Sequence, residues 1–144
     1  MFRIVFIFTI SIKLIYDQGK QKRISLVSFI EFTKQDSADW ILPENQDRIS
    51  SSIWITRKHN QSIFNIARED GYSVSNSSPL GTLWSNAPTV NTQSSDYTSF
   101  VAMHEGNPQC IINDTVSLYI PDYERYFDLI FLSFSGGNSS GGFS

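Results

Sequence analysis

The sequence predicts a single all-β domain, arranged as an antiparallel β-sandwich or jelly roll with little helix. Short runs of β-branched and aromatic residues recur along the chain, turn-forming loops separate them, and strands do not alternate with helices. The chain has 144 residues, of which 40% are hydrophobic and 14% are aromatic. It is therefore large enough for one core and too apolar for a disordered segment.

Residues 1–19 have two interpretations. Residues 4–12 form an apolar run behind Arg3, which is typical of a signal peptide, and the run is too short for a transmembrane span. Apolar residues also occupy every even position from Phe2 to Tyr16, which is the period of a β-strand. The first interpretation predicts an extracellular or cell-surface protein, and the second predicts a cytoplasmic one. Residues 20–144 form the single sandwich domain.

Four later segments have strand character. Residues 24–32 and 52–56 are rich in β-branched and aromatic side chains. Residues 116–120 and 126–134 have the same character, and they flank residues 121–125, which contain a proline and an aspartate suited to a turn. The last two segments are therefore predicted to form a β-hairpin.

Two segments are harder to assign. Residues 62–70 have apolar side chains at helical spacing, but Phe64 and Ile66 fit a strand equally well, and we predict a strand. Residues 135–144 are rich in glycine and serine, a composition typical of a flexible linker or a frayed end.

The composition argues against several classes of function. A net charge of −3, from 14 acidic and 11 basic residues, argues against nucleic-acid binding. One cysteine and two histidines, His59 and His104, are too few for a structural zinc site, and the apolar neighbours of Cys110 predict that it is buried. Residues 137–141 spell Gly-x-Ser-x-Gly, but no acid or histidine follows them in the chain. We therefore predict that the protein is not an enzyme.

Ordered blocks of residues from Phe32 to the end of the chain form a longer pattern. In the first half these blocks are Phe32-Thr33-Lys34, Ala38-Asp39, Leu42-Pro43, Asn45-Gln46-Asp47-Arg48-Ile49, Trp54-Ile55-Thr56-Arg57, Phe64-Asn65, Glu69, Ser78-Pro79, Gly81-Thr82 and Trp84. In the second half they are Tyr126, Asp128, Phe131, Ser133 and Gly141-Gly142-Phe143-Ser144. With these blocks the chain resembles an uncharacterised β-rich domain family that recurs in secreted and cell-surface multidomain proteins of microbes.

The resemblance implies an extracellular β-rich module without established catalytic residues. The chain departs from the family pattern at three places. Phe134 stands where the family usually has tryptophan, and Leu83 stands where an acidic residue is usual. The tyrosine and arginine that close the family pattern do not follow Ser144, which implies a domain that is truncated or incomplete at its C-terminus.

Three residues are candidates for binding a ligand. Trp40 and Trp84 border loops, where an exposed indole could stack on a sugar ring. The guanidinium of Arg57 could form a bidentate pair with a carboxylate. The alternative is structural in each case: the tryptophans anchor loops, and Arg57 is paired with groups of the fold itself.

The loop around residue 45 is a candidate calcium site. Asp39, Asn45 and Asp47, together with Glu44, supply the oxygen atoms that calcium prefers. The alternative is that these side chains bond to the backbone of their own loop and that no cofactor is bound. Elsewhere, four Asn-x-Ser/Thr sequons are candidate glycosylation sites on the eukaryotic secretory pathway: Asn60, Asn76, Asn113 and Asn138.

The sequence thus predicts a secreted or cell-surface module that is not catalytic and that serves adhesion. Its expected partner is an extracellular glycan, a matrix or a surface protein, with no nucleic acid and no membrane span. The alternative is a structural spacer or assembly module that binds no ligand, and a hydrolase domain is a distant third reading.

Overall fold

The computed structural model describes residues 9–10, 28–136 and 140–144. The chain divides into two compact units, residues 1–32 and residues 33–144. In unit 1, β1 (Thr9–Ile10) pairs antiparallel with β2 (Ser28–Phe29), so that Thr9 lies opposite Phe29. The remaining positions of the even-numbered alternation predicted from Phe2 to Tyr16 lie outside the described residues.

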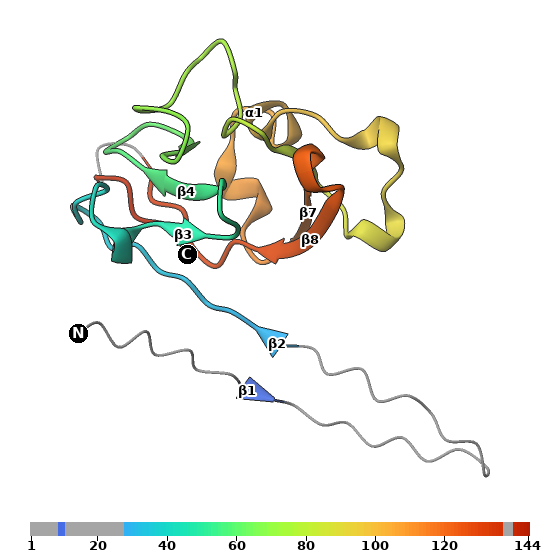
Figure 1. Ribbon diagram of the computed structural model, residues 1–144, viewed down its shortest axis with the longest axis horizontal. Coiled ribbons are helices and arrows are strands. Elements are labelled where there is room, and N and C mark those ends of the chain that lie inside the picture. Colours follow the sequence, from blue (N-terminus) through green and yellow to red (C-terminus); the bar gives the residue numbers. More distant parts are fainter. Residues whose placement is uncertain (1–8, 11–27, 137–139) are drawn as a thin grey trace. The chain divides into compact units, whose positions relative to one another are not determined.

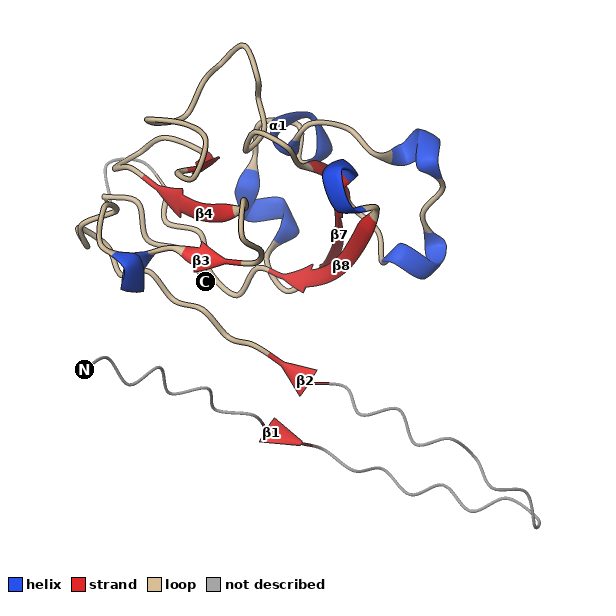
Figure 2. Cartoon of the chain, viewed as in Figure 1, coloured by secondary structure: helices blue, strands red, loops and turns tan. Residues whose placement is uncertain are grey.

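Unit 2 contains two antiparallel sheets of three strands each, which confirms the all-β prediction (Figures 1 and 2). In the first sheet the strand order is β3-β4-β5, with β3 (Asp47–Arg48), β4 (Trp54–Arg57) and β5 (Ile63–Asn65). In the second sheet the order is β6-β7-β8, with β6 (Leu83–Ser85), β7 (Thr115–Ile120) and β8 (Arg125–Ile130). None of the helices in the described ranges is long and apolar enough to cross a membrane.

The predicted hairpin at residues 116–134 is confirmed as β7 and β8. Its turn is the 3₁₀ helix Pro121–Tyr123, followed by Glu124 in the left-handed conformation with φ +50°. The two strands pair from Thr115 opposite Ile130 to Ile120 opposite Arg125. The second strand ends at Ile130, earlier than predicted, because the residues after it pair with other segments: Phe131 with Ile112, and Phe134 with Phe143.

The preference for a strand over a helix in residues 62–70 is also confirmed. Ile63–Asn65 form β5, with all three side chains buried, and they pair with β4. The chain then turns, because the backbone N–H groups of Arg68 and Glu69 both donate to the carbonyl of Asn65. The predicted strand at residues 52–56 is β4, shifted to Trp54–Arg57.

Helix is limited to single turns. The only α-helix among the described residues is α1 (Phe100–Met103), where the Ser99 hydroxyl caps the Ala102 N–H at 3.2 Å and the side chains of Phe100 and Met103 are buried. The 3₁₀ helices are Pro43–Asn45, Thr89–Asn91, Ser94–Asp96, Pro108–Ile111 and Pro121–Tyr123.

Aromatic rings fill the core beside the second sheet. Trp84 of β6 packs edge-on against Phe100 of α1, with ring centroids 5.0 Å apart, and Phe131 and Phe134 pack against the same Phe100 ring. Each such ring pair stabilises the fold by about 0.5–1.5 kcal/mol beyond the contribution of the apolar area that it buries. This cluster fixes α1 against β6 and sets the position of the residues that follow the helix.

Residues 140–144, here called the closing segment, correct the prediction of a flexible linker. Phe143 is only 4% exposed and pairs antiparallel with Lys34 on one side and with Phe134 on the other. The glycines permit this close packing: a Cβ on Gly141, whose φ is +83°, would lie 2.5 Å from the carbonyl oxygen of His59. The glycine-rich composition predicted a flexible segment, but Gly141 and Gly142 instead allow this segment to pack closely against the backbone of other segments.

Candidate functional site

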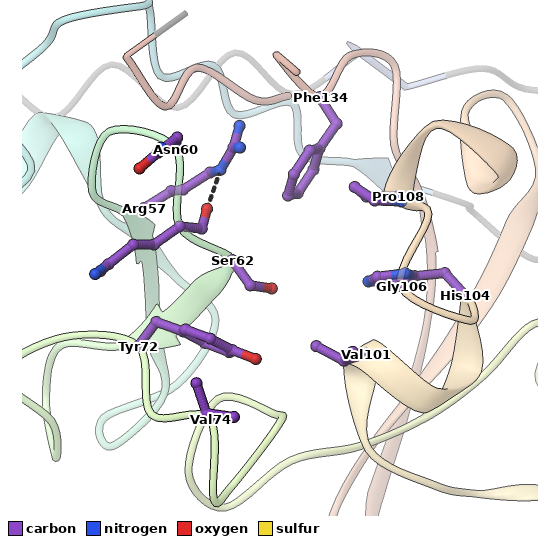
Figure 3. A pocket seen from close by; sticks show the side chains of 11 residues that line it. Arg57, Asn60, Ser62, Tyr72, Val74, Val101, His104, Gly106, Pro108 and Phe134 are labelled. Atoms are coloured by element: carbon purple, nitrogen blue, oxygen red, sulfur yellow. Dashed lines mark hydrogen bonds between the residues drawn. The ribbon is translucent and has the colours of Figure 1, made fainter. Parts of the chain in front are cut away.

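A pocket of about 460 Å³ lies in unit 2 and is the candidate functional site (Figure 3). This volume falls within the range of pockets that hold small ligands. One side is built by the end of β4 and the turn to β5, and the opposite side by α1 and the loop after it. Figure 3 shows Tyr72 and Val74 at one end of the pocket and the ring of Phe134 at the other.

The hairpin of β4 and β5 forms the first side. Arg57 is the last residue of β4 and Ser62 directly precedes β5, so the short turn between them brings Asn60 and Gln61 to the pocket. A hydrogen bond of 2.9 Å from the Gln61 N–H to the Lys58 carbonyl closes this turn. The hydroxyl of Ser62 is buried and has no hydrogen-bond partner among the described residues.

Helix α1 and the loop after it form the opposite side. Val101 and His104, three positions apart, share one face of the helical turn, and Gly106 and Pro108 continue the wall. His104 is 4% exposed, and its ring packs edge-on against Phe100 with centroids 4.6 Å apart. Neither Nδ1 nor Nε2 of His104 has a hydrogen-bond partner in another described residue.

The chemistry of His104 suits recognition. Burial lowers the pKa of its imidazole, so the ring is neutral at pH 7 and offers one N–H donor and one acceptor nitrogen. A buried polar group without a partner costs about 1–3 kcal/mol, and native proteins keep few of them. Here two such groups, His104 and Ser62, face the same pocket from opposite sides (Figure 3). A ligand with hydroxyl or carboxyl groups would satisfy both.

Arg57 supplies the positive charge of the pocket. It is buried and lies over the ring of Phe134, with its central carbon 4.0 Å from the ring centroid. Its Nη1 donates to the carbonyls of Ser135 at 2.7 Å and Gly142 at 3.1 Å, and its Nε donates to the carbonyl of Gln61. Arg57 is thus held structurally by carbonyl oxygens, and the one ion pair among the described residues joins Arg68 and Asp122 at 2.9 Å.

Lys34 and Asp36 complete a charged cluster around Arg57. The buried ammonium of Lys34 donates to the carbonyl of Gly141 at 3.1 Å. Burial, and then the charge of Arg57, lowers the pKa of Lys34. Hydrogen bonds from the Ser135 side chain and the Gly142 N–H lower the pKa of Asp36. Two cations and one carboxylate therefore meet at the closing segment.

The two tryptophans predicted to bind sugar differ in their exposure to solvent. Trp84 corrects the prediction: it lies within β6, is 1% exposed, and donates from Nε1 to the Thr82 hydroxyl at 2.8 Å, so no face of its ring is open to a sugar. Trp40 is half-buried, with the Lys58 ammonium 3.9 Å above its ring and Phe64 edge-on at 5.9 Å. Neither tryptophan lines the pocket.

The loop predicted to hold calcium makes local hydrogen bonds. The Asp39 carboxylate accepts from the Ile41 N–H at 3.0 Å, and the Asn45 amide donates to the Asp39 carbonyl at 2.8 Å. Burial alone raises the pKa of Asp47 to about 6, which disfavours the ionised form that calcium needs. Within the described ranges, no group of three or more His, Cys, Asp or Glu side chains, Glu44 included, is arranged to hold a metal ion.

The candidate glycosylation sites are exposed where the structure describes them. Asn60 lies in the β4–β5 turn at the pocket, Asn76 in the loop before β6, and Asn113 in a turn with φ +67° before β7. These positions could accommodate a glycan, which requires a surface location. Asn138 lies outside the described residues.

The prediction that Cys110 is buried is wrong. Cys110 is exposed in the 3₁₀ helix Pro108–Ile111, and its Sγ lies 3.7 Å from the carbonyl oxygen of His104. Its apolar neighbour Ile111 is buried instead, because successive side chains of a 3₁₀ helix point about 120° apart.

Sequence reasoning named Arg57 and Asn60 but missed the other polar residues of the pocket. The sequence does not predict Ser62, Tyr72 or His104 as binding residues. No motif marks them, because they come from separate segments that only the fold brings together. Comparisons of the chain with protein-family models, curated proteins and solved structures found no match.

Proposed function

We propose that unit 2 is a non-catalytic module, secreted or at the cell surface, that binds one sugar unit of an extracellular glycan in the pocket between Ser62 and His104. The observation that carries this proposal is the pair of buried polar side chains that face one pocket without partners. Sugars are recognised by such convergent polar groups beside an aromatic ring, and Phe134 and Tyr72 supply rings at the two ends.

Recognition is proposed in preference to catalysis because of how His104 is held. A histidine that acts as a general base needs a nucleophile or water within reach and a group that orients its second nitrogen. No aspartate or glutamate lines the described pocket, and Ser62 and His104 are not hydrogen-bonded to each other. The proposal retains the sandwich or jelly-roll arrangement of the two sheets and the extracellular location predicted from the sequence.

The full chain should be tested on immobilised neutral and acidic oligosaccharides with two pocket variants, Ser62→Ala and His104→Phe. Each removes one polar group with little change in volume, and we expect each to weaken binding about tenfold, the effect of one lost hydrogen bond. Ser75→Ala is the matched control, because Ser75 is exposed and, among the described residues, its hydroxyl bonds to Ser73 alone. Equal binding by the control and both pocket variants would reject the proposal.

The alternative of an assembly module has one observation in its favour. β8 is an edge strand of its sheet, and the apolar side chains of Ile130 on it and Leu132 after it are 48% and 49% exposed. Open apolar edges promote pairing between chains. Sedimentation that shows concentration-dependent self-association, abolished by Ile130→Lys, together with no retention on any oligosaccharide, would favour this alternative.

A further inference from the structure

The charges around the pocket indicate which kind of sugar it holds. Arg57 is the one permanently charged side chain among the described residues that line it. Every hydrogen bond that Arg57 donates to a described residue ends on a neutral carbonyl oxygen, of Gln61, Ser135 or Gly142. These bonds satisfy donor groups but leave the positive charge without a bonded carboxylate.

The carboxylates near Arg57 lie outside the pocket lining. Asp36 is held by the Gly142 N–H at 2.9 Å and by Ser135, and it interacts with Lys34 and Arg57, while Asp39 interacts with Lys34. Among the described residues that line the pocket, Arg57 therefore has no acidic residue opposite it. Charge interactions are stronger in such a partly dehydrated setting than in water, so the site favours an anion.

One nitrogen of Arg57 remains available to bind a carboxylate. Nε and Nη1 are occupied, whereas Nη2 donates no hydrogen bond to any described residue. The ring of Phe134 lies 4.0 Å from the guanidinium carbon and holds the plane of the guanidinium in place. A planar carboxylate can accept from Nη2 while sugar hydroxyls reach Ser62 and His104 on the two sides of the pocket.

We propose that the sugar unit held in this pocket is acidic: a uronic acid or another carboxylate-bearing sugar, with its carboxylate on Arg57 and its hydroxyl groups on Ser62 and His104. This inference rests on the function proposed above and narrows it from glycans in general to acidic glycans.

The test changes the ligand first, so that it does not depend on the folding of a variant. Methyl glucuronide and methyl glucoside differ only at C6, which is a carboxylate in the first and a hydroxymethyl group in the second. Each is titrated into the isotope-labelled full chain while amide and imidazole resonances are followed by NMR. We expect resonances around Ser62 and His104 to shift, with about tenfold tighter binding of the glucuronide. Raising the salt concentration should reduce that preference.

The outcomes separate the two proposals. Equal affinity for both sugars at the same resonances would overturn the acidic preference and leave glycan binding standing. No shift at the pocket with either sugar, up to tens of millimolar, would overturn both. Tighter binding of the glucuronide with shifts confined to other surfaces would also overturn the assignment to Arg57.

A pair of arginine variants then locates the charge. Arg57→Gln should remove the preference for the glucuronide, whereas Arg68→Gln removes the same charge from an exposed ion pair outside the pocket and should leave the preference unchanged. If Arg57→Gln does not fold, Arg57→Lys keeps the charge without the planar group, and we expect it to retain only part of the preference. Loss of the preference in Arg68→Gln as well would show a general effect of net charge and contradict the proposal.

Discussion

Two fully buried polar side chains in unit 2 have opposite surroundings. Asn65, at the end of β5, is 0% exposed and uses its whole amide: Oδ1 accepts from the N–H groups of Trp54 and Ala67, and Nδ2 donates to the carbonyls of Ser52 and Leu80. His104 is 4% exposed, and neither of its ring nitrogens has a partner among the described residues.

This difference separates the structural role of Asn65 from the binding role proposed for His104. Asn65 ties β4, β5 and the loop before β6 together, and all of its hydrogen-bonding capacity is used within the fold. The ring nitrogens of His104 make no hydrogen bond to another described residue, although the ring lines a pocket. This arrangement lowers the stability of the fold. The three predictions below test this contrast, from the largest expected effect to the smallest.

Replacing Asn65 with leucine should be strongly destabilising. The side chain keeps its approximate volume but leaves the Trp54 N–H and the carbonyls of Ser52 and Leu80 buried without partners. At about 1–3 kcal/mol for each unsatisfied group, we expect a loss of at least ~4 kcal/mol in the free energy of unfolding, measured by urea denaturation. Asn91→Leu, at an exposed position, is the control. If Asn65→Leu loses no more free energy of unfolding than the control, Asn65 does not have the structural role that distinguishes it from His104.

Asp47 is an intermediate case, because it is half-buried and its pKa is raised to about 6 by desolvation alone. The folded protein then holds this proton more tightly than the unfolded chain, whose ordinary value is 3.8. The contribution of Asp47 to stability is therefore full below about pH 4 and is lost as the pH rises to about 6. Asp47→Asn should remove this loss and raise the stability at pH 7 by about 1–3 kcal/mol.

The measurement is the melting temperature of both proteins from pH 4 to pH 7. His104, whose pKa is lowered by burial, also contributes to the pH dependence. The free energy of unfolding falls as the pH falls through the lower pKa of the folded state, because the unfolded chain then binds this proton more readily than the folded protein does. That contribution is common to both proteins and cancels in the difference between the curves. Parallel curves would show that Asp47 titrates normally.

His104→Phe should have the smallest effect on stability and the opposite sign. It removes two unpartnered nitrogens and keeps a ring against Phe100, so we expect a gain of about 1 kcal/mol together with weaker binding of sugar. A thermal melt of the full chain, without ligand, measures the gain. Lower stability of this variant would mean that His104 serves the fold, as Asn65 does.

The strands could be predicted where the local pattern of apolar residues matches the pairing of neighbouring strands in the structure. The hairpin of β7 and β8 has alternating apolar residues on both sides of a turn with proline and aspartate, and the structure follows it closely. Helix α1 was missed because four residues are too few to show a helical period. The closing segment was misassigned because a glycine-rich composition does not tell freedom from close packing, which depends on distant partners such as His59.

The pocket was less predictable than the strands. Arg57 was named as a ligand-binding candidate because of its charge, and the structure does place it in the pocket wall. Trp84 was named because aromatic residues near loops are often exposed, but the pairing of β6 with β7 draws it into the core. Ser62 and His104 lie 42 positions apart in the chain. Only the folded structure shows that both side chains line the same pocket.

The antiparallel pairing of Lys34 with Phe143 determines how unit 2 would respond to mechanical tension. Residues 33 and 144 lie at the same end of this pair, so a pull applied between them would peel its two hydrogen bonds one after the other instead of shearing both at once. Peeling would withdraw Phe143 from the core and remove the carbonyl of Gly142 from Arg57. Tension would therefore remove one of the carbonyls that hold Arg57 in the pocket wall, and the sugar binding proposed for this pocket would weaken with it.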